Sequence, residues 1–417
     1  MTKQIPQGYK QTKVGVIPES WKVVKLGDIA TIQRGASPRP IADSKWFSET
    51  SKIGWVRISD VSRAKKFLNF TEQYVSDDGV KNSRYIEIGN IIMSICATIG
   101  KPIYTNIPVC IHDGFIVFTN LTSNKFFMYY YLQLNENKWY RYGQPGSQIN
   151  LNTEIVNNET IALPPLKEQE KIADILTTWD NAITKQEQLI EQKRVFKKGI
   201  MQQIFSQKIR FKDDNDNDYP FWQKYKLTKV AKTSIGLVTT MTTNYVKNDG
   251  TPLIRNSDIS PNKIKDNLIQ LSTQFANQYS NRKLRYLDIV TIHTGEVGIS
   301  AVIDKKLDGC HGFATLNTKV DQNIVNPFFL SCYFNSCFYI SYAIKMSTGD
   351  GRCNFNLKDF DNSIIPTPIL EEQNKIVNFL TNIDDEITKQ IDVLDQLKLQ
   401  KQSLMQKLLI GQVRVKI

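Results

Sequence analysis

Potential metal ligands are scarce in this 417-residue chain, which has three histidines and six cysteines. The cysteines form no CxxC pair, whereas a structural zinc site needs four well-spaced soft ligands. We therefore expect no metal site, and mostly buried thiols in a reducing compartment. Cys332 and Cys337 are close in sequence, but ordinary core packing explains them better than a bond between them.

Long apolar runs are also absent. No run approaches the roughly 20 residues that span a bilayer. The first ten residues, MTKQIPQGYK, contain no hydrophobic signal core. The apolar fraction of 41% is ordinary for a globular protein. These features predict a cytoplasmic protein without a membrane segment.

Several catalytic signatures are missing as well. The sequence has neither a GxxxxGK[ST] phosphate loop nor a GxGxxG dinucleotide fingerprint, and its acidic residues form no nuclease-like cluster. The stretch Asn326-Pro327-Phe328-Phe329 approaches the N/D-P-P-F/Y motif of DNA amino-methyltransferases but lacks the second proline. Its aromatic context predicts a helix start with proline at an early position. We expect no catalytic residues and no bound cofactor in this chain.

Positive charge is in excess and unevenly distributed. The formal net charge is +12. Residues 1–166 carry 19 basic and 13 acidic side chains, and residues 206–370 carry 20 and 15. The segments 167–205 and 371–410 together sum to −1, and the last residues supply the remaining two charges. Two basic regions on a near-neutral frame favour a polyanionic partner, and DNA or RNA is the usual one.

The chain also repeats itself. The phrase PPLKEQEKIADIL at residues 164–176 returns as PILEEQNKIVNFL at residues 368–380, 204 positions later. Further upstream, residues 56–62 match residues 254–260 at an offset of 198. Internal repetition on this scale predicts two copies of one globular-plus-helix unit.

Apolar residues recur at spacings of 3, 4 or 7 from within each repeated phrase onward. They are Ile172, Leu176, Trp179, Ile183 and Ile190 in the first copy, and Ile376, Leu380, Ile383, Ile387, Leu394 and Leu397 in the second. Such spacing places one apolar seam on each of two helices, which at about 39 residues would be roughly 58 Å long. Neither helix buries its seam alone, so we expect an antiparallel coiled coil with a pseudo-twofold relation between the copies.

These features predict an α+β protein with two globular domains joined by two long helices. The expected order is a first globular domain at residues 1–165, a first helix at 166–206, a linker at 207–218, a second globular domain at 219–369, a second helix at 370–411 and a tail at 412–417. The sequence IRFK after the first helix returns as VRVK in the tail. We therefore expect the tail to dock beside the start of the first domain, which closes the repeat into a circle.

The chain resembles the specificity subunits of type I restriction-modification systems. The resemblance lies in the repeated P-x-L-x-E-Q-x-x-I phrase, the opening GVIPESWKVVKLGDIA at residues 15–30, and the layout of two units and two helices. It covers essentially the whole chain, although Ile369 replaces the second proline in the second copy of the phrase.

This resemblance implies a division of labour. In the family, each globular unit is a target recognition domain that reads one half of a split DNA site, and the helices set the distance between the halves. The helices also dock two methyltransferase subunits, which bind S-adenosylmethionine and modify adenine. Separate motor-nuclease subunits, using ATP and Mg²⁺, cut unmodified DNA. The implied partners of this chain are therefore double-stranded DNA and both kinds of subunit.

Comparison of the two copies separates a shared frame from candidate base-reading residues. Identical positions, such as Arg57 with Arg255, are expected to serve the fold or contact phosphates. Loops that differ are better candidates for base readout, because the two half-sites should differ. The candidate DNA-binding residues are Arg34, Ser37, Arg39, Arg57, Ser94, Thr98, Gln144, Ser147, Gln148, Thr239, Thr240, Arg255, His293, Thr294, Glu296, Arg352 and Asn354. Arginine suits guanine, and glutamine or asparagine suits adenine.

At the 198-residue offset, Gly114-Phe115 aligns with Gly312-Phe313 and Gly100 aligns with Gly298. We assign these glycines to the shared frame.

Deleting about one heptad from the first helix is expected to change the gap between the half-sites and leave the half-sites intact.

Two other interpretations stay open on the sequence alone. One is a coiled-coil adaptor whose globular units bind protein or RNA. The other is the specificity component of a related restriction system that cuts on both sides of its site. Salt-sensitive, sequence-selective binding to duplex DNA would argue against the adaptor, and the identity of the partner subunits would distinguish the two restriction systems.

Overall fold

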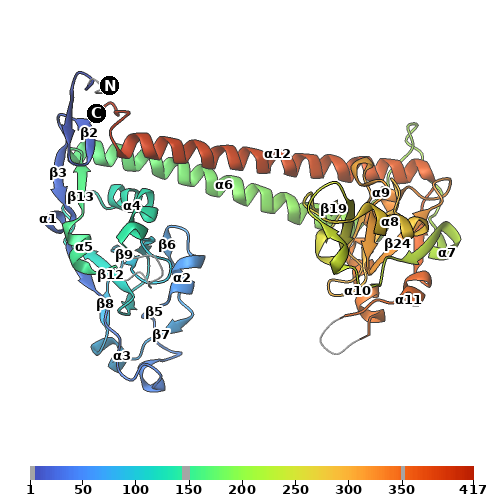
Figure 1. The fold of residues 1–417 in the computed structure, drawn as a ribbon, viewed down its shortest axis with the longest axis horizontal. Helices are drawn as coiled ribbons and strands as arrows, with labels where there is room; N and C mark the ends of the chain where they lie inside the picture. Colours follow the sequence, from blue (N-terminus) through green and yellow to red (C-terminus); the bar gives the residue numbers. More distant parts are fainter. Residues whose placement is uncertain (1–4, 143–150, 349–352) are drawn as a thin grey trace. The chain divides into compact units, whose positions relative to one another are not determined.

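The computed structural model describes residues 5–142, 151–348 and 353–417. Their contacts divide the chain into two units: unit 1 contains the residues up to Glu187 together with Val393–Ile417, and unit 2 contains Gln188–Asp392. Both chain ends therefore belong to unit 1 (Figure 1). Among the described residues, no helix has both the length and the apolar character needed to cross a membrane.

Unit 1 is built on two β-sheets. The larger has the order β4 (Thr31–Arg34), β12 (Phe115–Thr119), β9 (Ile91–Ser94), β10 (Pro102–Thr105) and β6 (Phe67–Leu68). The smaller has the order β7 (Gln73–Tyr74), β5 (Gly54–Val56), β11 (Val109–Ile111) and β8 (Arg84–Ile86). Two-stranded pairs are formed by β1 (Tyr9–Thr12) with β2 (Gly15–Pro18), and by β3 (Lys22–Lys25) with β13 (Thr160–Leu163).

Side-chain alternation along β12 explains how unit 1 is layered. Ile116 and Phe118 join the apolar cluster that contains the aromatic residues of α4 (Lys125–Leu134). Phe115 and Val117 join the cluster shared with the smaller sheet. Since successive side chains of a strand point to opposite faces, the larger sheet is buried on both sides. The remaining short helices are α1 (Leu26–Ile29), α2 (Ile58–Arg63), α3 (Asp77–Lys81) and α5 (Thr153–Asn158), with 3₁₀ segments at Ser44–Trp46 and Glu136–Tyr142.

Unit 2 repeats this plan. One sheet has the order β15 (Ala231–Ile235), β24 (Thr315–Val320), β21 (Ile289–Ile292) and β22 (Ser300–Val302). The other has the order β16 (Tyr245–Val246), β20 (Ile269–Leu271), β17 (Thr251–Arg255) and β23 (His311–Phe313). The two-stranded pairs are β14 (Gln223–Lys226) with β25 (Ile364–Thr367), and β18 (Ile259–Ser260) with β19 (Lys263–Ile264).

The described part of unit 2 also contains short helices, as unit 1 does. They are α7 (Leu227–Val230), α8 (Thr273–Gln278), α9 (Pro327–Phe334), α10 (Cys337–Met346) and α11 (Leu357–Asp361), with 3₁₀ segments at Thr242–Asn244, Asn256–Asp258, Ser280–Arg282 and Lys305–Leu307. Helix α9 is capped by Asn326, whose side chain accepts hydrogen bonds from the backbone nitrogens of Phe328 and Phe329. Pro327 stands in the first turn, which confirms the predicted helix start.

The two long helices are α6 (Leu166–Phe205) and α12 (Leu370–Leu409), and they are packed together (Figure 1). In unit 1, Ile172 near the start of α6 shares a core with Leu408 near the end of α12. In unit 2, Ile204 near the end of α6 shares a core with residues near the start of α12. The helices therefore run antiparallel. The predicted α+β class with two paired long helices is confirmed.

A buried carboxylate near the start of α6 ties the chain ends together. Glu168 is 0% exposed and accepts a 3.0 Å hydrogen bond from Trp21 Nε1. The Arg414 guanidinium donates to both carboxylate oxygens of Glu168, at 2.6 and 3.0 Å. Tyr9 also donates its hydroxyl to the Gly411 carbonyl at 3.0 Å. The tail thus docks beside the start of the first domain, as the sequence predicts.

Unit 2 has the same arrangement without a chain end. Glu372 is 0% exposed and accepts a 3.0 Å hydrogen bond from Trp222 Nε1. Arg210 donates to the two carboxylate oxygens at 3.0 and 2.7 Å. An unpaired buried charge is costly, so each arginine stabilises the buried carboxylate near the start of one long helix.

Other identical positions also belong to the shared frame. Asp60 and Asp258 are 3% and 1% exposed, and each accepts a hydrogen bond from a backbone nitrogen three residues earlier, at 2.9 and 3.0 Å. Gly100 and Gly298 have φ values of +81° and +88°, a conformation that favours glycine.

The cysteines are less uniformly buried than predicted. Cys110, Cys310 and Cys332 are buried, Cys96 and Cys353 are half-buried, and Cys337 is exposed. Burial raises the pKa of the Cys332 thiol to about 11, so this thiol is protonated at neutral pH.

Candidate nucleic-acid interface

In unit 1, two of the loops that differ between the copies, residues 34–39 and residues 94–98, leave the same end of the larger sheet. Arg34, the last residue of β4, pairs with Ile116, and Ser94, the last residue of β9, pairs with Phe115 at the start of β12. The loop after β4 and the loop after β9 therefore begin beside the end of the turn that precedes β12. The register of three strands positions them, so their relative placement is a property of the sheet.

Unit 2 places the corresponding loops at the equivalent end of its sheet. Ile235, the last residue of β15, pairs with Leu316, and Ile292, the last residue of β21, pairs with Thr315 at the start of β24. An isolated bridge joins Thr294 to Asn354, so the candidate residue Asn354 also lies at this end. The two units thus present different sequences on matching sheet edges.

The turn that precedes β12 is one residue longer than the turn that precedes β24. Ile111 and Gly312 occupy equivalent positions, because each carbonyl accepts a hydrogen bond from the loop after β4 or β15, at 3.0 and 2.7 Å. Three residues separate Ile111 from Phe115, whereas two separate Gly312 from Thr315. Phe115 is therefore equivalent to Thr315.

This register overturns one alignment made from the sequence. Gly114-Phe115 does not correspond to Gly312-Phe313, because the strand pairings place the two segments at different positions. The longer turn of unit 1 contains a His112-Asp113 pair, whereas the shorter turn of unit 2 consists of Phe313 and Ala314.

Asp113 brings three of the candidate residues together. Its backbone carbonyl accepts a 2.7 Å hydrogen bond from Arg34 Nε, and its carboxylate accepts a 3.0 Å hydrogen bond from Ser37 Oγ. A nitrogen of Arg39 lies 3.6 Å from the same carboxylate. We call these four residues the Asp113 cluster. Burial alone would raise the pKa of Asp113, but the Ser37 hydrogen bond and nearby positive charges outweigh it and lower that pKa.

A surface hollow beside the Asp113 cluster is also lined by Trp55, Arg57 and His112. His112 Nδ1 accepts a 2.9 Å hydrogen bond from the Gly114 nitrogen, so the neutral ring carries its proton on Nε2. Burial lowers the pKa of His112, although Asp113 opposes the shift. The hollow therefore combines guanidinium donors, a carboxylate acceptor and an imidazole N–H, which are groups that can pair with base edges.

The corresponding edge of unit 2 carries a group of neutral polar side chains, with the exposed carboxylate of Glu296 in the same loop. His293 Nδ1 and Thr294 Oγ1 are 2.8 Å apart, and Thr294 Oγ1 donates to Asn354 Oδ1 at 3.2 Å. The Asn256 side chain accepts a 3.2 Å hydrogen bond from the His293 backbone nitrogen. Burial lowers the pKa of His293 and so favours the neutral ring. The two sheet edges therefore differ in charge as well as in sequence.

Two candidates have internal roles. Ser94 is 0% exposed, and its hydroxyl donates to the Thr98 carbonyl inside the β9–β10 turn. It closes this turn and does not reach the surface, which corrects its selection as a base-reading residue. Arg255 donates two hydrogen bonds to Asp258, at 2.9 and 3.0 Å. Arg57 is exposed, and no such side-chain bond holds it within the described residues.

The other candidates are accessible or lie outside the described part of the chain. Thr98 and Thr239 are half-buried, whereas Thr240 and Glu296 are exposed. The candidates outside the described residues are Gln144, Ser147, Gln148 and Arg352.

Comparison of the copies by sequence missed Trp55, His112, Asp113 and Asn256. The constant offset concealed the longer turn of unit 1; a one-residue gap after Ile111 would have exposed the extra residue in the turn that contains His112 and Asp113. Trp55 and Asn256 carry no comparable signal, because they reach the two sheet edges from neighbouring strands and turns.

Two basic α+β units with different loops on equivalent sheet edges, joined by a paired-helix frame, define a two-module recognition protein. The family model described as the type I restriction modification DNA specificity domain matches residues 18–192 and again residues 195–397. The chain therefore belongs to the type I restriction-modification DNA specificity family and is the non-catalytic specificity component of such a system.

Relatives and solved structures agree with this assignment. The putative type I restriction enzyme MjaX specificity subunit of Methanocaldococcus jannaschii is 28% identical, over 98% of this chain and 97% of the relative. The EcoBI specificity subunit of Escherichia coli is 23% identical, over 90% and 82%. A chain from a structure of a type I restriction-modification complex matches with a TM-score of 0.64 at 18% identity, covering 95% of this chain and 99% of that one. The S subunit from M. genitalium matches at 0.51 and 13%, covering 93% and 96%.

Proposed function

We propose that each unit reads one half of a bipartite site in double-stranded DNA through the sheet edge that carries its differing loops. The main support for this proposal is that the two units have equivalent sheet edges that carry different side chains. A shared frame explains how both units approach DNA in the same way, and the unmatched residues explain how they select different bases. The excess of basic over acidic side chains in both globular regions supports a polyanionic partner.

The chemistry of the two edges favours different contacts. In unit 1, the guanidinium groups of Arg39 and Arg57 match the paired acceptors of guanine, and Asp113 matches the amino group of cytosine. In unit 2, Asn354 can pair with adenine, and the Thr294 hydroxyl pairs with either donors or acceptors. The phosphate contacts that align each unit would come from other basic side chains of the same regions.

The long helices supply the remaining parts of the proposed function. They set the gap between the half-sites and dock two methyltransferase subunits, which bind S-adenosylmethionine and methylate adenine. Motor-nuclease subunits that use ATP and Mg²⁺ complete the restriction complex in the cytoplasm. This chain contributes the sequence selectivity of the complex, and the other subunits contribute its chemistry.

Arg39→Ala tests the assignment of the first edge. In complex with its methyltransferase subunits, this variant should lose preference for one base of the first half-site. A lost bidentate contact costs about 1–3 kcal/mol, or roughly 5- to 150-fold in selectivity. The measurement is sequencing of methylated products from a duplex library in which every half-site position is varied. The second half-site serves as an internal reference.

Arg285→Ala is the matched control. Arg285 is an exposed arginine 3.7 Å from Asp308, a geometry similar to that of Arg39 and Asp113, and it precedes the opposite end of β21. Its loss should leave both half-sites unchanged. The assignment of this edge would be contradicted if Arg39→Ala and Arg57→Ala both kept every base preference of the parent chain.

A further inference from the structure

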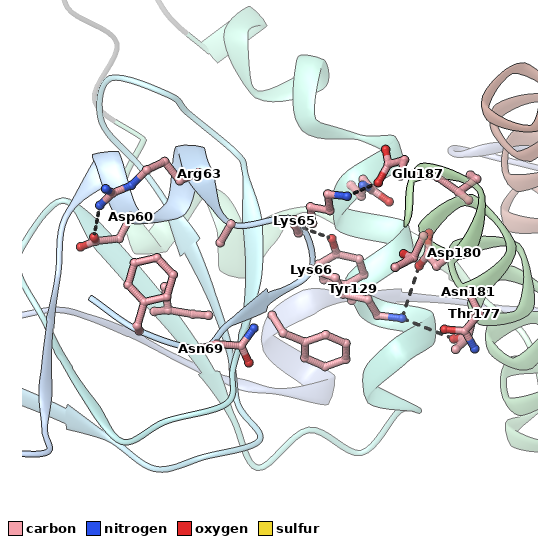
Figure 2. A pocket seen from close by; sticks show the side chains of 17 residues that line it. Asp60, Arg63, Lys65, Lys66, Asn69, Tyr129, Thr177, Asp180, Asn181 and Glu187 are labelled. Atoms are coloured by element: carbon pink, nitrogen blue, oxygen red, sulfur yellow. Dashed lines mark hydrogen bonds and ion pairs between the residues drawn. The ribbon is translucent and has the colours of Figure 1, made fainter. Parts of the chain in front are cut away.

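A groove in unit 1 separates the segment after α2 from the first part of α6 (Figure 2). Its lining includes Arg63 at the end of α2, Lys65 and Lys66 from the segment after it, Tyr129 from α4, and Asp180 from α6. At this groove, polar side chains of the globular domain reach the long helix. The apolar core of unit 1 also joins the globular domain to α6, but apolar packing has no strongly preferred direction.

Lys66 is the central residue of this contact and is only 9% exposed. Its Nζ donates to Tyr130 Oη at 2.7 Å. Figure 2 shows the same Nζ pointing toward α6, where it donates to Thr177 Oγ1 at 3.3 Å and lies 3.5 Å from the Asp180 carboxylate. The same Nζ is 4.5 Å from the ring centres of both Phe126 and Tyr130. Removing an ammonium from water is costly unless it is paired, so these contacts define one favourable position for Lys66.

Asp180 connects this contact to the second long helix. One carboxylate oxygen accepts a 2.5 Å hydrogen bond from Tyr130 Oη, and the other lies 2.5 Å from Lys401 Nζ on α12. We call Lys66, Tyr130, Thr177, Asp180 and Lys401 the Lys66 junction. It joins the segment after α2, helix α4 and both long helices through charge-assisted hydrogen bonds, which depend strongly on geometry.

Unit 2 keeps the helix-to-helix pair, but its described residues include no counterpart of the buried Lys66 ammonium. Lys197 and Asp384 are 2.5 Å apart and correspond to the Lys401–Asp180 pair at the 204-residue offset. On α9, Cys332 stands where Tyr130 stands on α4, relative to equivalent asparagine caps. Asn262 reaches Cys332 Sγ through a neutral contact of 3.7 Å. The segment that contacts α4 in unit 1 therefore uses a charged side chain, whereas Asn262 makes a neutral contact with α9 in unit 2.

We propose that the Lys66 junction holds the first globular domain in one orientation on α6 and thereby determines the gap at which the first half-site is read. This inference rests on the proposed function, and it assigns Lys66 a positioning role without contact to DNA. Apolar packing keeps the domain attached, and the junction selects one among several similar packings. Losing it should relax the gap without changing the bases that are read.

Lys66→Met is the main test, because methionine has an unbranched side chain of similar length and no charge. The two half-sites and the gap are first defined by methylated-adenine mapping with the parent chain and its methyltransferase subunits. A duplex library then carries those half-sites at the parental gap and at gaps one or two base pairs shorter or longer. Lys66→Met should lower the preference for the parental gap by roughly tenfold, with half-site preferences unchanged.

Lys65→Met is the matched control. Lys65 is the neighbouring lysine and also pairs with α6, through Glu187, but its side chain is 73% exposed. Exposed pairs contribute little, so this variant should keep the parental gap preference. Tyr130→Phe removes the hydroxyl that bridges Lys66 and Asp180 and keeps the ring. It should relax the gap in the same direction as Lys66→Met, and it decides the matter if Lys66→Met does not fold.

The outcomes separate this inference from the proposed function. A parent chain without two-part DNA selectivity would overturn both. A parent chain with a defined gap, together with folded Lys66→Met or Tyr130→Phe variants of unchanged gap preference, would overturn the positioning role alone. Altered base preference in the first half-site would also overturn it, because the junction would then act on base reading.

Discussion

Shortening both long helices by one heptad tests whether they set the gap between half-sites. The segments to remove are residues 186–192 of α6 and residues 390–396 of α12, which correspond at the 204-residue offset. The deletion keeps the Lys401–Asp180 pair of unit 1 and the Lys197–Asp384 pair of unit 2, which lie on either side of it. Because the helices are antiparallel, a deletion in both preserves their register, whereas the sequence alone suggested a deletion in one.

The size of the effect follows from helix geometry. Seven residues at about 1.5 Å each shorten a helix by about 10.5 Å, or about three base pairs at roughly 3.4 Å per pair. A heptad turns the helix by only about 20° from its original phase. Three base pairs turn one half-site by about 100° around the duplex, given about 10.5 pairs per turn. The expected result is a gap three base pairs shorter, read with lower affinity than the parental site.

Methylated-adenine mapping of cells that express the shortened chain with its methyltransferase subunits measures both half-sites and the gap. The matched control is the deletion in α6 alone. It cannot keep the ion pairs of both units in register, and it should reduce methylation without producing a new defined gap. The reasoning would be refuted if the double deletion kept the parental gap, or if it changed the half-sites at an unchanged gap.

Three further predictions concern stability and activity. Arg414→Ala should lower the stability of unit 1 by about 3 kcal/mol, because it leaves the buried Glu168 carboxylate with Trp21 alone, and Arg210→Ala should act likewise on unit 2. Hydrogen exchange resolves the two units; unchanged exchange in either variant would contradict the prediction. Burial lowers the pKa of His311 below 6.5, so the unfolded chain binds more protons as pH falls, and thermal stability should decrease between about pH 7 and pH 5. His311→Gln should show a smaller decrease, and an identical one would count against this assignment. The isolated chain should neither transfer methyl groups from S-adenosylmethionine to DNA nor cut DNA; methyl transfer detected with labelled S-adenosylmethionine would contradict this.

The helical frame was predictable because its information is local and repeated. The apolar spacing after each P-x-L-x-E-Q phrase predicts a helix, and the duplication predicts the antiparallel pair. The position of the tail was also predictable, since Arg414 repeats Arg210 at the offset that relates the helices. These residues act in equivalent contacts in both units.

The reading edges and the Lys66 junction were less predictable. Asp113 stands in a turn whose extra residue is recognised only from strand register, so a constant offset conceals it. Lys66 is one of many lysines in the sequence, and its importance comes from side chains on α4, α6 and α12 that surround it. Ser94 illustrates the opposite error, because a polar residue in a differing loop can serve only the turn that contains it.

The most direct test of the central claim is methylated-adenine mapping in cells with and without this chain. The account predicts that methylation at one two-part motif disappears when the chain is removed and returns when it is restored. It further predicts that substitutions on the sheet edge of unit 1 change only one half of that motif, and substitutions on the edge of unit 2 only the other. A methylation pattern that is the same with and without the chain would contradict the account.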